Sequence, residues 1–444
     1  MNSAERTPLL DAGRLTISTK LAYALGHVFN DLAAAMWFSY TLIYLQRVAL
    51  LKPIAAGALL LLGQIIDAIM TPVFGFLVDR YCKKKIWHVV GSVMVTLSFP
   101  VIFGGFASSS PTIAMLVYVT SITIFQTGWA AVQISHLSMI PSLTNSLLAR
   151  ADLTAIRYSA QVSAAVVVFV VTWIVLPTSG ESMVQLDQQD DYKFRNIVVI
   201  LTSFGLTATV FFHMFLKANL LEQNSFPKNA NVEEASSGIS DNSSNRRMSW
   251  VAITILLRVA MLYVASRLFI ILATVYLPLY IEETKVGGKQ ALATVPLVLY
   301  VSSFAAALLL KYINRTCGTK VCYFLGAVIG IMAAVVTEFV KSSTAVIYVV
   351  AVLVGTGSSI TMVTALSVTA ELIGSRTERS ALVYSAVTFL DKIITGLVVI
   401  LIEKWRCNDS ELCPTYNRDT LSVVCVSSMI LGLLTLLSVS RCLT

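Results

Sequence analysis

Charged residues are scarce in this sequence. Asp, Glu, Lys and Arg make up 13% of the 444 residues, against roughly 25% in soluble globular proteins. Hydrophobic residues account for 56%, and the mean hydropathy is +0.78. This balance excludes a soluble globular protein. The apolar residues come in long unbroken runs and not in short alternating segments, which also excludes a transmembrane β-barrel.

The apolar runs predict an all-α integral membrane protein. A membrane-spanning helix needs about 20 mostly apolar residues. Twelve stretches meet this requirement: 20–45, 54–78, 86–107, 112–140, 152–176, 194–217, 256–281, 290–310, 319–340, 344–370, 380–402 and 420–440. The segment 218–250 is rich in Asn, Ser and charge, which predicts a flexible linker. It divides the chain into two six-helix halves, 20–217 and 251–440, with tails at 1–19 and 441–444.

Several familiar signatures are missing. The first nineteen residues have no short apolar core with a cleavage site, so we expect no signal peptide. There is no P-loop, no G-x-S-x-G and no zinc-spaced Cys/His set, which predicts no enzyme, no cofactor and no metal site. The net charge of +8 is spread over loops, and no basic soluble domain is present to bind nucleic acid.

The charged loops predict the topology. Lys and Arg gather in 80–85, 217–247 and 311–320, whereas acidic residues dominate 177–192. The positive-inside rule therefore places both termini and the linker in the cytosol. On the opposite side, Cys407 and Cys413 flank a short loop, in which Asn408 begins a glycosylation sequon. In an oxidising lumen these two cysteines can form a disulfide, and the sequon can be glycosylated.

A few ionisable residues interrupt the apolar stretches, and they are the candidate functional residues. A charge near the bilayer centre costs between about 2.5 and 10 kcal/mol, so it usually faces the protein interior and marks a pathway. The alternative is a salt bridge that only fixes helix packing. The candidates are Asp31, Asp67, Arg157, Arg267, Asp391 and Lys392. The polar or aromatic side chains Gln126 and Trp129 are candidates for lining a pocket, although packing explains them equally well.

Two short motifs lie on the predicted cytosolic side. Gly75, Asp79 and Arg80 form the pattern G-x-x-x-D-R between the second and third helices, which predicts a gating latch; a simple positive-inside loop is the alternative. In the N-terminal tail, Glu5 precedes Leu9 and Leu10 in an acidic dileucine pattern, E-x-x-x-L-L. Such a pattern predicts binding to clathrin adaptors and sorting to lysosome-related organelles.

The G-x-x-x-D-R loop resembles that of the major facilitator superfamily. The segment LGQIIDAIMTPVFGFLVDR resembles the second helix of its glycoside-pentoside-hexuronide:cation symporters. In that family two aspartates four residues apart serve cation coupling; here they correspond to Asp67 and Thr71, so one carboxylate is missing. The resemblance implies a substrate-binding role for Asp31 and Arg157 and a place beside the cation site for Lys392.

Other segments, among them YALGHVFNDLAAAMWFSYTLIYL and FLDKIITGL, are similar to one lysosomal and melanosomal member of this superfamily. That resemblance implies import of cysteine from the cytosol into the organelle by alternating access. A zwitterion such as cysteine needs an acid for its ammonium group, Asp31 or Asp67, and a base for its carboxylate, Arg157 or Lys392. Titration of Asp67 is expected to couple transport to a proton or cation. The alternatives are a sugar:cation symporter, and a membrane scaffold or receptor that transports nothing.

Overall fold

The computed structural model describes residues 16–81, 84–105, 110–144, 147–176, 186–216, 242–284, 288–341, 343–373, 380–407 and 413–440. These residues form twelve α-helices and no strand. The N-terminal half contains α1 (Ile17–Ile43), α2 (Pro53–Tyr81), α3 (Lys84–Ile102), α4 (Pro111–Leu143), α5 (Leu147–Val175) and α6 (Asp191–Phe215). The C-terminal half contains α8 (Asn242–Thr284), α9 (Ala291–Cys317), α10 (Thr319–Phe339), α11 (Thr344–Ile373), α12 (Ser380–Lys404) and α13 (Tyr416–Ser440). The N-terminal half also contains two short elements. A π-helix, η1 (Tyr44–Val48), continues α1, and a 3-10 turn, η2 (Gln188–Asp190), precedes α6.

The all-α fold predicted from the apolar runs is confirmed, with local differences at the helix ends. Helix α8 begins at Asn242, inside the stretch predicted as linker, and α3 ends at Ile102 although the predicted helix ran to residue 107. Nine of the described helices are long and apolar enough to cross a membrane. The remaining three, α1, α5 and α12, do not meet that threshold within the described residues, so twelve spans stays a prediction. In α1 the polar side chains of the candidate site lower the hydropathy.

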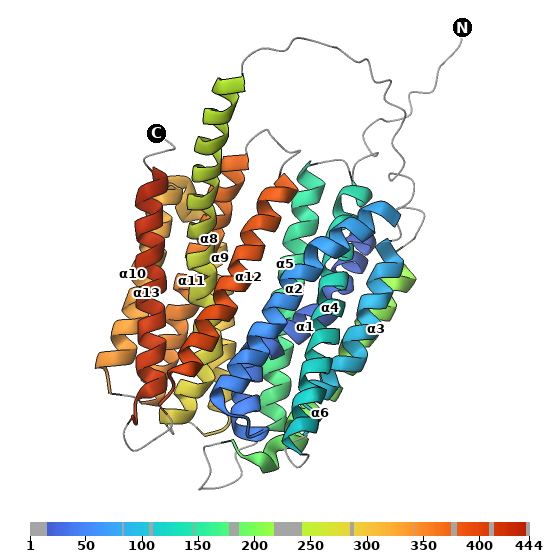
Figure 1. Cartoon of the computed structure of the whole chain (residues 1–444), viewed down its shortest axis with the longest axis vertical. Coiled ribbons are helices and arrows are strands. Elements are labelled where there is room, and N and C mark those ends of the chain that lie inside the picture. Colours follow the sequence, from blue (N-terminus) through green and yellow to red (C-terminus); the bar gives the residue numbers. More distant parts are fainter. Residues whose placement is uncertain are drawn as a thin grey trace.

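The helices pack into two bundles that lie side by side (Figure 1). Within the N-terminal half, α3 and α2 pack on α4, and α5 and α6 pack on α1. Within the C-terminal half, α10 and α9 pack on α11, and α13 packs on α8. Three helix pairs join the halves: α2 with α12, α5 with α9, and α1 with α8. The candidate residues predicted from sequence lie on α1, α2, α4, α5, α8 and α12, so five of these six helices belong to the joining pairs.

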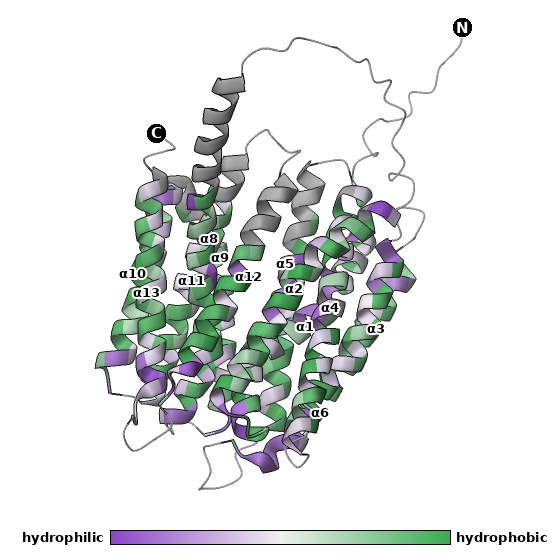
Figure 2. Ribbon diagram, in the orientation of Figure 1, coloured by the Kyte–Doolittle hydropathy of each residue, from purple (hydrophilic) through white to green (hydrophobic). Residues whose placement is uncertain are grey.

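The outer surface of the bundle is apolar. Figure 2 shows hydrophobic residues along the helix bodies and hydrophilic ones gathered toward the helix ends. On α3, for example, Val89, Val93 and Leu97 repeat every four residues and are 44%, 51% and 68% exposed. A stripe with this spacing forms one face of a helix. Because a large exposed apolar surface is unfavourable in water, this face is suited to contact lipid.

Glycine allows α3 and α4 to approach closely. A Cβ atom at Gly91 would lie 2.7 Å from the carbonyl oxygen of Gly128, and a Cβ at Gly128 would lie 2.8 Å from that of Gly91. Small residues at such crossings are the usual way in which membrane helices gain packing contacts, since lipid offers no hydrophobic driving force between them. This crossing fixes α4, which carries Trp129 and His136, next to α3, which carries His88.

Candidate functional site

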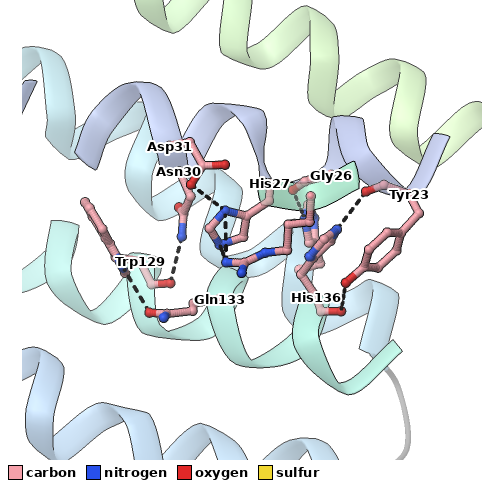
Figure 3. Close-up of polar contacts among 10 residues, drawn as sticks. Tyr23, Gly26, His27, Asn30, Asp31, Trp129, Gln133 and His136 are labelled. Atoms are coloured by element: carbon pink, nitrogen blue, oxygen red, sulfur yellow. Dashed lines mark hydrogen bonds and ion pairs between the residues drawn. The ribbon is translucent and has the colours of Figure 1, made fainter. Parts of the chain in front are cut away.

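One polar cluster lies inside the N-terminal half, between α1, α4 and α5 (Figure 3). His27 and Asp31 are one helical turn apart on α1, and Arg157 reaches them from α5. The Nδ1 atom of His27 lies 2.9 Å from Oδ1 of Asp31. The Nη2 atom of Arg157 lies 3.0 Å from Nε2 of His27 and 3.4 Å from its Nδ1. His27 thus stands between the acid and the base that the sequence singled out.

The charges fix which ring nitrogen of His27 carries the proton. A guanidinium can only donate hydrogen bonds, so Nε2, the nitrogen nearer to Arg157, accepts and holds a lone pair. The proton of the neutral ring is then on Nδ1, which donates to Asp31. Among the described residues, Oδ2 of Asp31 and Nε of Arg157 are buried and have no hydrogen-bond partner. The triad therefore offers one unused acceptor and one unused donor.

More histidines surround this triad. His136 stacks on the ring of Tyr23, with centroids 4.2 Å apart, and its Nε2 lies 2.8 Å from the Tyr23 carbonyl oxygen. His88 contacts the Gly26 carbonyl oxygen through Nε2 at 2.7 Å. In the part of the chain that the structure describes, no three His, Cys, Asp or Glu residues converge in a way that could hold a metal ion. Hydrogen bonds and ring contacts connect the members of the cluster.

Trp129 and Gln126 lie on α4 beside this cluster. The indole Nε1 of Trp129 donates to Oε1 of Gln133 at 3.2 Å, and its carbonyl accepts from the Asn30 side chain at 3.1 Å (Figure 3). Gln126 is buried against α2, where its amide nitrogen would be 3.2 Å from a Cβ at Gly63. Trp129 thus adjoins Asp31 through its neighbour Asn30, whereas Gln126 faces the crossing of α2 and α4.

A second polar cluster joins the two halves at the crossing of α2 and α12. The Nζ atom of Lys392 lies 2.7 Å from Oδ2 of Asp67 and 3.0 Å from Oγ1 of Thr71. The Thr71 hydroxyl also donates to the Asp67 carbonyl oxygen at 2.7 Å. The lysine ammonium therefore sits at the site where the family resemblance placed a cation. The Asp67 carboxylate thus links α2 to α12 through Lys392.

Asp391 and Lys392 are adjacent in sequence, but they serve different partners. Adjacent residues on an α-helix point about 100° apart. Lys392 therefore faces α2, while Oδ2 of Asp391 pairs with Nε of Arg267 on α8 at 3.1 Å. Arg267 remains 31% exposed although α8 is a mostly buried helix.

Three buried carboxylates fasten the halves at the end away from the start of α1. Glu282 of α8 pairs with Arg47 at 2.5 Å, and Glu403 of α12 accepts from the Gln46 side chain at 2.9 Å. Asp190, in η2, accepts from Lys289 of the C-terminal half at 2.7 and 3.0 Å. We call these contacts the distal latch. None of its members was predicted as a site residue, because each lies at a helix end, where charge is ordinary.

The distal latch gives a testable prediction. Lys193 also binds Asp190, at 2.9 Å, but within the same half. Lys289→Ala should therefore open the distal end, whereas Lys193→Ala should not.

The opening is measured with a cysteine in place of Tyr300, whose ring packs on Phe169 across the two halves. Labelling of this cysteine by a membrane-impermeant maleimide should accelerate about fivefold, the factor that a contact worth roughly 1 kcal/mol supplies. Equal acceleration by both variants would show that the latch does not control opening.

The other sequence predictions have mixed outcomes. Cys407 and Cys413 are joined by a disulfide, with their Cα atoms 6.2 Å apart. The sequon at Asn408, the sorting residues Glu5, Leu9 and Leu10, and the Asp79 side chain lie outside the described residues. The Arg80 guanidinium lies 5.8 Å from the ring centroid of Phe76, on its own helix. At Gly75 an added Cβ would meet nothing within 4 Å. The gating role of this loop remains a prediction.

This fold of twelve helices in two bundles matches that of transporters of known structure. Solved structures of that type match almost the whole chain: PepTSo2 with a TM-score of 0.67 at 12% identity, covering 96% of this chain and 99% of that one. The inward-open xylose transporter XylE from E. coli matches with a TM-score of 0.65 at 12% identity, covering 96% and 95%. At such low identity these likenesses show the fold alone.

Sequence similarity shows to which family the chain belongs. The profile of the family "MFS/sugar transport protein" matches residues 22–403, and the chain belongs to that family. It is 35% identical to major facilitator superfamily domain-containing protein 12 of Homo sapiens over 90% of this chain and 87% of that protein. It is equally similar to the Mus musculus protein of the same name, with the same coverage. The resemblance on which the sequence predictions rested is thereby confirmed, and the chain belongs with secondary transporters and not with an enzyme family.

Proposed function

We propose that this transporter carries cysteine from the cytosol into lysosomes or melanosomes by alternating access. The observation that carries the proposal is the triad of Asp31, His27 and Arg157. Its unused acceptor, Oδ2 of Asp31, suits an ammonium group, and its unused donor, Nε of Arg157, suits a carboxylate. Charge-assisted hydrogen bonds of this kind are the strong ones. Asp31 and Arg157, an acid and a base separated by the ring of His27, thus complement an amino-acid zwitterion.

The runner-up function is sugar:cation symport, which the family description favours. A sugar carries no charge, so it gives the facing acid and base no counter-charges. In addition, Asp67 already accepts the Lys392 ammonium, and Thr71 stands where a second carboxylate would serve a cation. These two observations favour the amino-acid substrate. A scaffold or receptor role offers no use for buried groups with unused hydrogen-bonding capacity, which cost about 1–3 kcal/mol each.

The proposal is tested in cells in which Leu9 and Leu10 are both alanine. Loss of the dileucine pattern should bring part of the protein to the plasma membrane, with its lumenal face outward. Radiolabelled cysteine is then followed in both directions, because import into an organelle corresponds to export from the cell. We expect cysteine to move in these cells and not in cells that carry the intact sorting motif. Surface-expressed protein that moves a sugar but no cysteine would replace this proposal by the runner-up.

A further inference from the structure

The four histidines of this chain gather in one region. They are the only histidines among its 444 residues, and ring contacts connect them in a row. Ring centroids are 5.3 Å apart for His27 and His136, 6.1 Å for His136 and His88, and 5.0 Å for His88 and His213. Asp31 lies at one end of the row. Histidine is the side chain that most readily changes charge near neutral pH, so this region invites the question of where a proton can bind.

In most of these rings the N–H hydrogen is already donated to a neighbouring acceptor. His136 and His88 each point Nε2 at a backbone carbonyl oxygen, at 2.8 and 2.7 Å, so each must donate from that atom. The Nδ1 atom of His88 lies 3.1 Å from Nε2 of His213 and accepts from it. Lys85, near His213, adds a positive charge whose ammonium donates to backbone carbonyls of α6. A further proton on this side would therefore face existing N–H donors and a cation.

His27 itself has no open nitrogen. Its Nδ1 hydrogen is donated to Oδ1 of Asp31, and its Nε2 lone pair is covered by the Arg157 guanidinium. The hydroxyl of Tyr23, whose ring stacks on His136, donates to the His136 carbonyl oxygen at 3.4 Å. Among the titratable groups that face His27, two acceptor atoms are left without a partner in the described structure: Oδ2 of Asp31 and Nδ1 of His136. Of these, Oδ2 alone belongs to an acid.

We propose that Oδ2 of Asp31 is a shared site, which holds either a proton or the ammonium group of the substrate, and that His27 enforces this competition. The inference rests on the proposed function. His27 already donates to Oδ1 and Arg157 covers His27, which leaves Oδ2 as the oxygen of Asp31 without a partner. An incoming proton and an incoming ammonium group therefore both bind there. His27 is a positioning residue here, since it acts on the substrate only through Asp31.

This competition makes the protein a proton-exchanging carrier. At the cytosolic face the proton leaves Oδ2 and the substrate ammonium replaces it, while the carboxylate of the substrate takes the free Nε–H of Arg157. At an acidic face a proton displaces the ammonium group, the substrate leaves, and the proton returns with the empty carrier. One proton thus leaves the lumen for each zwitterion that enters it, and an acidic lumen drives the accumulation of the substrate there. Asp67 is unsuited to this role because the Lys392 ammonium already neutralises it.

The experiment measures binding of radiolabelled cysteine to the purified full-length protein between pH 4.5 and 6.5. Over this range free cysteine remains a zwitterion, so a change in affinity belongs to the protein. For the natural sequence the dissociation constant should rise about tenfold per pH unit on the acidic limb, as for one proton competing with one ligand. Asp31→Asn should remove this slope, and Asp67→Asn should keep it.

Two histidine variants separate positioning from structure. His27→Ala frees Oδ1, so an Asp31 protonated on one oxygen still offers the other to the ammonium group. The competition weakens, and the slope should fall below about threefold per pH unit. His27→Gln should restore the slope, because its amide N–H can donate to Asp31 while its oxygen accepts from Arg157. His213→Gln, at the far end of the row, is the matched control and should behave like the natural sequence.

A further measurement uses the unaltered protein, so its result does not depend on whether a variant folds. Cysteine added to the unaltered protein in weakly buffered solution at pH 5.5 should release protons in step with binding. Proton uptake, no proton change, or cysteine binding that is independent of pH would overturn the shared site and leave cysteine transport standing. Protein that neither binds nor moves cysteine at any pH would remove the proposed function, and the shared site with it.

Discussion

Lys392→Ala should abolish transport and also destabilise the protein. The substitution leaves the Asp67 carboxylate buried at the α2–α12 crossing without its ammonium partner. Removing one member of a buried ion pair typically costs about 3–5 kcal/mol. Because this pair joins the two halves, we expect cysteine transport to fall at least about 100-fold, which corresponds to roughly 2.7 kcal/mol. The melting temperature of the purified protein should fall with it.

A double variant distinguishes a functional pair from a structural one. Asp67→Asn together with Lys392→Met removes both charges and keeps similar side-chain volumes. Replacing a buried ion pair by uncharged groups is often neutral for stability, so the melting temperature should recover. Transport should not recover, because the halves then lack the contact that must break and re-form as they rock. A double variant that transports at the natural rate would mean that the pair only holds the helices together.

Arg157→Ala should weaken cysteine transport about 10- to 100-fold, because a hydrogen bond to a charged group contributes roughly 1.5–3 kcal/mol. The loss should appear mainly in KM, since Arg157 is proposed to hold the substrate carboxylate. Arg157→Lys should recover only part of it, because an ammonium cannot reproduce the planar fork of donors. Transport rates are measured at matched surface expression over a range of cysteine concentrations.

Arg258→Ala is the matched control for this series. Arg258 lies in the first half of α8 and donates to the Ser438 carbonyl oxygen at 3.3 Å, on α13. Its removal should leave KM for cysteine within about twofold of the natural value, as for a partly exposed contact. If Arg157→Ala and Arg258→Ala had the same small effect, Arg157 would have no part in substrate recognition.

The sequence alone determined the helices well. The apolar stretch predicted at 319–340 corresponds to α10 at Thr319–Phe339, and the one at 344–370 to α11 at Thr344–Ile373. Hydrophobic length is a local property, and a bilayer imposes the same length on every span. The start of α8 was predicted too late because its first turns are polar, and polar residues carry no hydropathy signal for a helix.

The sequence also singled out most of the ionisable residues of the site. Asp31, Asp67, Arg157, Arg267, Asp391 and Lys392 each stand out because a charge is costly among apolar neighbours. It did not show which of these charges pair: Asp67 pairs with Lys392, and Asp391 pairs with Arg267. The choice depends on how α2, α8 and α12 cross and on which way each side chain points. No local pattern contains that information.

Only the tertiary structure decided the role of His27 and the distal latch. Residues four apart on a helix share a face, so the sequence puts His27 beside Asp31. It does not show that Arg157 of α5 covers the remaining nitrogen of the ring. Likewise, Asp190 lies just before α6 and Lys289 just before α9, at helix ends where charge is common, and only the packing of the halves brings them together. The cost of burying a charge can be judged from its neighbours in sequence, whereas the identity of its partner depends on contacts between distant segments.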